Sequence, residues 1–148
     1  MTSFFPDLNV WLALSDAGNS HAADAWRWLN ELPGETTLLF SRYTQLGLLR
    51  LLTNRAVMGD YAYKVQNGWR VYDRWLVDPR VQFHPEPRDI DLAFRDATQL
   101  FADQPASKWI GDCYLLAFAK EIGATLVTFD KALLNLARKY HYTAIVPS

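Results

Sequence analysis

Residues 109–133 constrain the fold of this chain more than any other segment. Apolar residues recur at helical spacing there, at Leu115, Phe118 and Ile122, and indicate a helix with one buried face. Gly123 follows directly, where a helix that ends in a left-handed residue needs glycine. Residues 125–129 form a short segment of apolar and β-branched residues, which is typical of a strand buried on both faces. A further helix is predicted after it. The segment therefore predicts one unit of a parallel α/β sheet.

Strands and helices alternate along the rest of the chain in the same way. We predict strands at residues 3–6, 37–40, 81–84, 125–129 and 143–146, the last as an edge strand. We predict helices at residues 9–14, 21–32, 42–54, 61–76, 90–101, 109–122 and 132–140, with Ser41 as an N-cap. This alternation predicts a parallel α/β sandwich formed by a single domain that spans residues 1–148.

The composition indicates a globular chain without a membrane span. Half of the residues are hydrophobic, which excludes a disordered chain. No apolar run approaches the roughly 20 residues that cross a bilayer. Pro6 and Asp7 interrupt the apolar start of the chain, so no secretory signal is expected. The single cysteine, Cys113, has no partner for an internal disulfide, which indicates a reducing, cytoplasmic location.

Three aspartates are placed directly after a predicted strand or near the start of a predicted helix. Asp7 comes directly after the first predicted strand, Asp130 comes directly after residues 125–129, and Asp112 lies in the expected first turn of the helix between them. Ligands of open α/β sheets bind at the carboxyl ends of the strands, so we expect these side chains to converge there. Carboxylates suit hard divalent cations such as Mg²⁺ and Mn²⁺, which polarise phosphate oxygens and generate hydroxide. The sequence therefore predicts a divalent-metal site.

Sequence signatures of several other hydrolases are absent. There is no HExxH motif, no CxxC pair, no glycine-rich phosphate loop and no GxSxG elbow. His21, His84 and His141 stand isolated, and we interpret them as packed or exposed side chains rather than ligands or bases. The net charge is −1, but residues 42–80 carry seven basic and three acidic side chains. This excess suits a polyanionic substrate as well as it suits a solvated helical face.

Four sequence blocks together resemble a known family. They are DLNVWL at residues 7–12, SRYTQLGLLR at 41–50, DCYL at 112–115 and LVTFD at 126–130. In this order they resemble the PIN domain, in particular the VapC-type toxin ribonucleases of type II toxin–antitoxin pairs. The resemblance implies a PIN-like three-layer α/β sandwich with a five-stranded parallel sheet flanked by helices. It also implies Mg²⁺- or Mn²⁺-dependent endonucleolytic cleavage of RNA, a homodimer, and a cognate antitoxin protein as partner.

The resemblance assigns site residues position by position. Asp7, Asp112 and Asp130 match the family's acidic residues, while Asn9 and Thr128 match an accompanying amide and hydroxyl. In the expected mechanism, metal-assisted hydrolysis of an RNA phosphodiester, Asp7 and Asp112 bind the metal directly. Asp130 ligates it through water or helps to activate the attacking water. The amide and the hydroxyl hold carboxylates or a metal-bound water in place.

Gln45 departs from the family pattern, which places a glutamate in the first turn after the second strand. An amide offers a neutral oxygen, but it neither acts as a general base nor neutralises the charge of a cation. We therefore expect one principal metal ion, with Gln45 orienting its water shell. Arg50, further along the same helix, is expected to contact substrate phosphate or to anchor a carboxylate. Arg42 and Lys131 are candidates for contacts with the RNA backbone, or ordinary exposed cations.

Other readings of the aspartates fit less well. A receiver domain needs a phosphate-accepting aspartate after its third strand, where His84 stands, and a lysine after its last strand, where residues 147–148 are proline and serine. A phosphoryl-aspartate hydrolase needs a second aspartate at the position of Asn9. The remaining alternative is a non-catalytic PIN-like module that binds RNA or protein. Gln45 favours this alternative, and the three aspartates oppose it.

Overall fold

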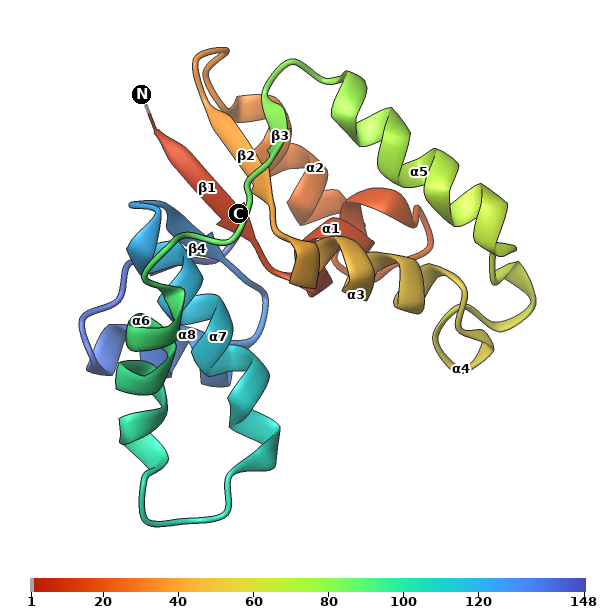
Figure 1. The fold of residues 1–148 in the computed structure, drawn as a ribbon. Helices are drawn as coiled ribbons and strands as arrows, with labels where there is room; N and C mark the ends of the chain where they lie inside the picture. Colours follow the sequence, from red (N-terminus) through yellow and green to blue (C-terminus); the bar gives the residue numbers. More distant parts are fainter. Residues whose placement is uncertain (1) are drawn as a thin grey trace.

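The computed structural model describes residues 2–148 and contains a five-stranded parallel sheet (Figure 1). The strands are β1 (Ser3–Pro6), β2 (Thr37–Phe40), β3 (Val81–Phe83), β4 (Thr125–Val127) and β5 (Ala144–Ile145), in the spatial order β3-β2-β1-β4-β5. Every neighbouring pair runs parallel. The predicted sheet is confirmed. β1 and β2 have the predicted bounds, and the other three strands are one or two residues shorter than predicted.

The helices connect successive strands. α1 (Leu8–Ser15) and α2 (Ala22–Glu31) lead to β2, and α3 (Arg42–Leu52), α4 (Arg55–Met58), the 3₁₀ turn η1 (Gly59–Tyr61) and α5 (Val65–Val77) lead to β3. α6 (Ile90–Thr98), the 3₁₀ turn η2 (Gln99–Phe101) and α7 (Ser107–Glu121) lead to β4, and α8 (Lys131–Lys139) leads to β5. Within residues 2–148 no helix is long and apolar enough to cross a membrane.

Strand side chains alternate between two hydrophobic cores. Leu38, Phe40 and Val127 pack into a core with residues of α1, α2, α3 and α5. Leu39 and Leu126, their neighbours in sequence, pack into a second core with residues of α6, α7 and α8. Successive strand residues point to opposite faces of a sheet, so each strand is buried on both sides. The two groups of helices lie on opposite sides of the sheet, which confirms the three-layer sandwich (Figure 1).

The direction of the chain across the sheet reverses between β1 and β4. From β1 the chain builds outward to β2 and β3, and it then returns through α6 and α7 to place β4 on the other side of β1. Pro6 is in register with Val127, and the Asp7 N–H donates to the Val127 carbonyl oxygen over 2.8 Å. Such reversals create the crevice in which open α/β sheets bind ligands. The residues that follow β1 and β4 are therefore neighbours at this edge.

Helix α7 begins earlier than predicted. It starts at Ser107, and the Trp109 N–H already donates to the Ala106 carbonyl oxygen over 2.9 Å. No proline or glycine interrupts residues 107–109, so nothing prevents the helix from starting there. Asp112 consequently lies in the second helical turn, and its predicted place in the first turn was wrong. The predicted end of this helix agrees better with the structure, because Gly123 has the expected left-handed backbone conformation, with φ of 67°.

The segment between α3 and α5 contains structure that the sequence did not predict. The Asn54 side chain accepts a hydrogen bond from the Ala56 N–H over 2.8 Å and caps the short helix α4. Gly59, with φ of 60°, ends α4, and a 3₁₀ turn follows. Because these turns occupy residues 59–61, α5 begins at Val65 rather than at residue 61.

Candidate active site

Asp7 is fixed at the point where β1 passes into α1. As the N-cap of α1, its Oδ1 accepts a hydrogen bond from the Leu8 N–H over 2.6 Å. Its Oδ2 accepts hydrogen bonds from the Thr128 hydroxyl at 2.8 Å and from the Asn9 amide at 3.3 Å. Burial raises the pKa of Asp7, the hydrogen bonds from Thr128 and Leu8 lower it, and the charge of Asp130 raises it further. Asp7 is thus a buried carboxylate held by neutral donors.

Asn9 and Thr128 tie the segment after β1 to the segment after β4. The Asn9 amide nitrogen donates to the Thr128 hydroxyl oxygen at 3.3 Å, and the Asn9 amide oxygen accepts from the Phe129 N–H at 3.1 Å. The Thr128 hydroxyl oxygen also accepts from the Asp130 N–H at 3.0 Å. The structure therefore brings together the amide, the hydroxyl and two of the aspartates that the family resemblance selected. One small network positions both loops.

Asp130 is the N-cap of α8. Its Oδ1 accepts hydrogen bonds from the Ala132 and Leu133 N–H groups at 2.9 and 3.2 Å. The residue is exposed, and its Oδ2 accepts no hydrogen bond from the described residues. One oxygen of Asp130 therefore fixes the side chain, while the other is available to a ligand or a bound water.

Asp112 reaches the same edge from the side of α7. The pKa of Asp112 is raised to about 6 by burial, then by the charge of Asp7 and then by that of Asp130. No hydrogen bond or ion pair to its carboxylate forms within residues 2–148. The three predicted aspartates therefore lie within one another's electric field, and Asp112 carries the least compensated charge.

A divalent cation suits the chemistry of this cluster. The donors are carboxylate oxygens, their mutual repulsion raises pKa values, and none of the three forms an ion pair in the described chain. As the side chains stand, no group of three or more histidine, cysteine, aspartate or glutamate residues among 2–148 is arranged to enclose a metal ion. Hard cations such as Mg²⁺ retain several waters and need few direct protein ligands. The residues thus fit a cation whose coordination is completed by water.

The side chain of Gln45 forms hydrogen bonds with neighbouring side chains. It is buried near the start of α3, and its Oε1 accepts a hydrogen bond from Arg42 Nη1 at 2.5 Å. A hydrogen bond from Gln45 also lowers the pKa of Tyr72, which burial raises. The guanidinium of Arg42 lies 4.7 Å from the centre of the Phe83 ring. Gln45 therefore holds Arg42 in place through one of the two lone pairs of its carbonyl oxygen.

The three predicted cations are free of carboxylate partners. The ion pairs found in the described part of the chain do not involve Arg42, Arg50 or Lys131, and all three are exposed. Arg50 lies on the side of the acidic cluster, because its charge lowers the pKa of the Tyr43 hydroxyl, which the cluster raises. Lys131 is the first residue of α8, next to Asp130. None of the three cations therefore forms an ion pair with the aspartates of the cluster in the described chain.

Sequence reasoning missed Tyr43 at this site. The pKa of Tyr43 is raised by burial, then by the charges of Asp7 and Asp112, and is lowered by Arg50. Its hydroxyl oxygen lies where a side chain at Gly111 would otherwise stand. One signal was present in the sequence, since Tyr43 and Arg50 are seven positions apart and so share a helix face, about two turns from each other.

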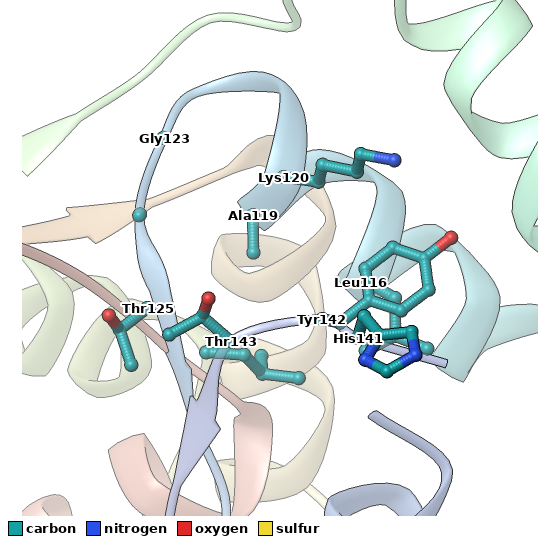
Figure 2. Close-up of a pocket in the computed structure, with 10 residues that line it drawn as sticks. Leu116, Ala119, Lys120, Gly123, Thr125, His141, Tyr142 and Thr143 are labelled. Atoms are coloured by element: carbon teal, nitrogen blue, oxygen red, sulfur yellow. The ribbon is translucent and has the colours of Figure 1, made fainter. Parts of the chain in front are cut away.

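None of the three histidines forms a hydrogen bond or an ion pair with the aspartates in the described part of the chain. His21 stacks on Phe129 with ring centroids 4.2 Å apart, and His84 packs edge-on to Phe118 at 5.9 Å. His141 is exposed and lines a separate cavity with Lys120, where α7 and the amino end of β4 meet the segment before β5 (Figure 2). This cavity lies at the opposite end of β4 from Asp130. The histidines are packed or exposed, as predicted.

The fold and this acidic edge define the class of protein. The PIN domain profile matches residues 4–139, so the chain belongs to the PIN domain family. Proteins of this family that are ribonucleases generally depend on divalent metals. Within the family, the chain is 38% identical over 132 residues to Ribonuclease VapC41 of Mycobacterium tuberculosis, covering 85% of this chain and 88% of that protein. The family resemblance predicted from the sequence is confirmed.

Solved structures share the fold at low sequence identity. VapC20 of Mycobacterium tuberculosis, described as a sarcin-ricin loop cleaving toxin, matches with a TM-score of 0.65 and 17% identity, covering 89% of this chain and 93% of that chain. VapBC2 of Rickettsia felis, bound to a promoter DNA fragment, matches with a TM-score of 0.69 and 13% identity over 99% and 100% of the two chains. VapBC-1 of nontypeable Haemophilus influenzae matches with a TM-score of 0.68 and 17% identity over 98% of each chain.

Proposed function

We propose that this chain is a divalent-metal-dependent endoribonuclease that acts as the toxin of a toxin–antitoxin pair. The observation that carries the proposal is the convergence of Asp7, Asp112 and Asp130 from three separate elements at the β1–β4 edge. Burial and the charges of Asp7 and Asp130 together raise the pKa of Asp112, and none of the three carboxylates forms an ion pair with a cation of the described chain. A relative with 38% identity, Ribonuclease VapC41, supports RNA as the substrate class.

The three aspartates have different roles toward the metal ion in this proposal. A bound Mg²⁺ or Mn²⁺ polarises the phosphate and lowers the pKa of water. Asp7 and Asp112 would hold this ion through their carboxylate oxygens. Asp130, whose Oδ1 caps α8 and whose Oδ2 accepts no hydrogen bond in the described chain, would hold a water beside the ion or accept a proton from the attacking water. Thr128 and Asn9 keep the Asp7 carboxylate in position through the hydrogen bonds that it accepts from both.

The unpaired cations position the RNA. Arg50 acts on Tyr43 together with the acidic cluster and contacts a phosphate of the RNA, while Arg42 and Lys131, which are exposed, contact its backbone. Gln45 supports this role through its hydrogen bond to Arg42. Because the Gln45 oxygen accepts this hydrogen bond, Gln45 acts on the site chiefly through Arg42. A single principal metal ion follows from having three carboxylates and no fourth.

We further propose a cognate antitoxin, a homodimer and a cytoplasmic location. Solved neighbours include VapBC complexes, which supports an antitoxin partner for this chain. Cys113 is a free, buried thiol, as suits a reducing compartment. Co-purification of the chain with the product of an adjacent small gene, together with loss of RNA cleavage in that complex, tests the antitoxin. Light scattering of the isolated chain tests the dimer.

RNA cleavage with and without metal tests the proposed reaction. The purified chain should cleave an RNA pool in Mg²⁺ and stop in EDTA, and Asp7→Asn and Asp112→Asn should abolish cleavage while remaining folded. Asp60→Asn, which removes an exposed carboxylate from η1, is the matched control and should cleave like the wild type. The part-buried hydrogen bond between Gln45 and Arg42 favours one alternative, a non-catalytic module. RNA binding without any Mg²⁺-dependent cleavage would support that alternative and overturn the nuclease.

A further inference from the structure

Tyr43 stands at the acidic edge without a role in the chemistry described so far. It is the second residue of α3 and is 38% exposed. Among residues 2–148 its hydroxyl makes no hydrogen bond, although Asp7, Asp112 and Arg50 all act on it electrostatically. A polar group at this position is thus close to three residues of the proposed site and open to solvent. The side chain is available to a substrate.

Gly111 provides the space that the Tyr43 hydroxyl occupies. A Cβ built on Gly111 would collide with the Tyr43 hydroxyl oxygen and would lie 3.5 Å from Cζ. Gly111 stands inside α7, where glycine costs roughly 1 kcal/mol relative to alanine. The close approach of the hydroxyl explains this choice, because any larger residue would push the phenol away from Asp112, the next residue in the chain.

The ring of Tyr43 is held by aromatic packing. Its centroid lies 5.4 Å from that of Tyr114, and Tyr114 packs on Phe118 at 6.0 Å, within the core beneath α7. The hydroxyl therefore projects from a supported ring into a cradle that only glycine leaves open. Such support from neighbouring residues is what a substrate-positioning side chain requires.

We propose that Tyr43 contacts the RNA, with its hydroxyl donating a hydrogen bond to a non-bridging oxygen of the phosphate that is cleaved. This inference rests on the proposed nuclease function. Three carboxylates repel a phosphate, so a neutral donor among them adds attraction without competing for the metal. Burial and the nearby aspartates raise the pKa of Tyr43, so the phenol keeps its proton at neutral pH. Arg50 supplies the charged contact on the same helix face, and Tyr43 supplies the neutral one.

A double-mutant cycle between positions 43 and 111 tests the inference. Tyr43→Phe removes the hydroxyl and retains the ring, and kcat/KM for a fluorophore–quencher RNA pool of mixed sequence should fall about 10- to 100-fold. Gly111→Ala should lower kcat/KM similarly, because the new methyl group displaces the hydroxyl. The double variant should lose no more than Tyr43→Phe alone, since the displaced group is already gone. The half-saturating Mg²⁺ concentration and the melting temperature of Tyr43→Phe should match the wild type.

Controls separate this inference from the proposed function. Tyr61→Phe removes a hydroxyl from an 83% exposed tyrosine of η1 and should leave cleavage unchanged. If the wild type cleaves and Tyr43→Phe has the same kcat/KM, only the role of Tyr43 is overturned. Independent, additive losses from Tyr43→Phe and Gly111→Ala would also overturn it. If the wild type itself does not cleave RNA in Mg²⁺, the proposed function fails and the role of Tyr43 fails with it.

Discussion

The Thr128 hydroxyl donates a hydrogen bond to Asp7 over 2.8 Å, although the two residues are 121 positions apart in the chain. Asn9 completes the arrangement, since its amide nitrogen is 3.3 Å from both the Asp7 carboxylate and the Thr128 hydroxyl. Burial disfavours the ionised form of Asp7, and the hydrogen bond from Thr128 opposes that effect. The loop after β4 thus influences the charge of a carboxylate in the loop after β1.

Thr128→Val tests this dependence directly. Valine keeps the β-branched shape and removes only the hydroxyl, so Asp7 loses its shortest side-chain donor and shifts toward its neutral form. We expect RNA cleavage to fall about 10- to 100-fold and the half-saturating Mg²⁺ concentration to rise, as for other residues that orient metal ligands. Initial rates across a Mg²⁺ titration measure both. Thr143→Val, at an exposed position, is the matched control, and equal cleavage by both variants would contradict the assigned role.

The raised pKa of Asp112 predicts a pH-dependent stability of the metal-free protein. Its value of about 6 compares with about 3.9 for an unperturbed aspartate. A carboxyl group whose pKa is higher in the folded chain contributes stability that is complete below about pH 4 and is lost as the pH rises through about 6. We therefore expect Asp112→Asn to melt at a higher temperature than the wild type in EDTA at neutral pH.

Melting temperatures measured in EDTA between about pH 4 and neutral pH test the predicted direction of this stability change. The advantage of Asp112→Asn should shrink toward zero as the pH falls to about 4, where the wild-type carboxyl group is protonated. Asp7 also has a raised pKa, so the difference between the two proteins, rather than either curve alone, isolates Asp112. A difference that stayed constant with pH would show that Asp112 has no raised pKa. Asp60→Asn, in an exposed turn, serves as the control.

Much of the fold follows from local pattern. β1 and β2 have the predicted bounds because short apolar segments end at Asp7 and at Ser41, two residues that cap helices. The order of strand and helix then places Asp7 and Asp130 at one edge, since parallel strands end on the same side. The start of α7 was mistaken because nothing between Ser107 and Trp109 marks a boundary. Capping by Asn54 likewise gave a short helix that periodicity does not reveal.

The contacts between individual side chains of the site could not be predicted from the sequence. The family resemblance selected Gln45 for its departure from glutamate, but no pattern shows that its oxygen is bonded to Arg42. The Tyr43 hydroxyl of α3 lies against Gly111 of α7, and these two positions are far apart in the chain. Such contacts depend on how two helices meet across the sheet edge, which only the folded chain determines.

Gln45→Glu tests whether position 45 still influences the metal. The carboxylate would keep the bond to Arg42 as an ion pair, and the site would gain negative charge. We expect the half-saturating Mg²⁺ concentration to fall about three- to ten-fold, the scale of one added charge acting through a partly solvated site. Gln45→Leu breaks the bond to Arg42 and should raise the KM for RNA with little change in Mg²⁺ dependence. If Gln45→Glu changes neither Mg²⁺ dependence nor rate, Gln45 acts only on Arg42.

Arg50 forms no ion pair in the described structure, so we expect it to bind phosphate rather than to anchor a carboxylate. Arg50→Ala should lower kcat/KM about ten-fold and reduce the slope of log activity against log salt concentration by about one, because one phosphate contact is lost. Arg55→Ala, exposed on α4, is the control and should keep the wild-type slope. If Arg50→Ala instead alters the Mg²⁺ dependence and leaves the salt slope unchanged, Arg50 anchors a carboxylate. In that case Arg42 and Lys131 would have to supply the phosphate contacts, and their alanine variants should then reduce the slope.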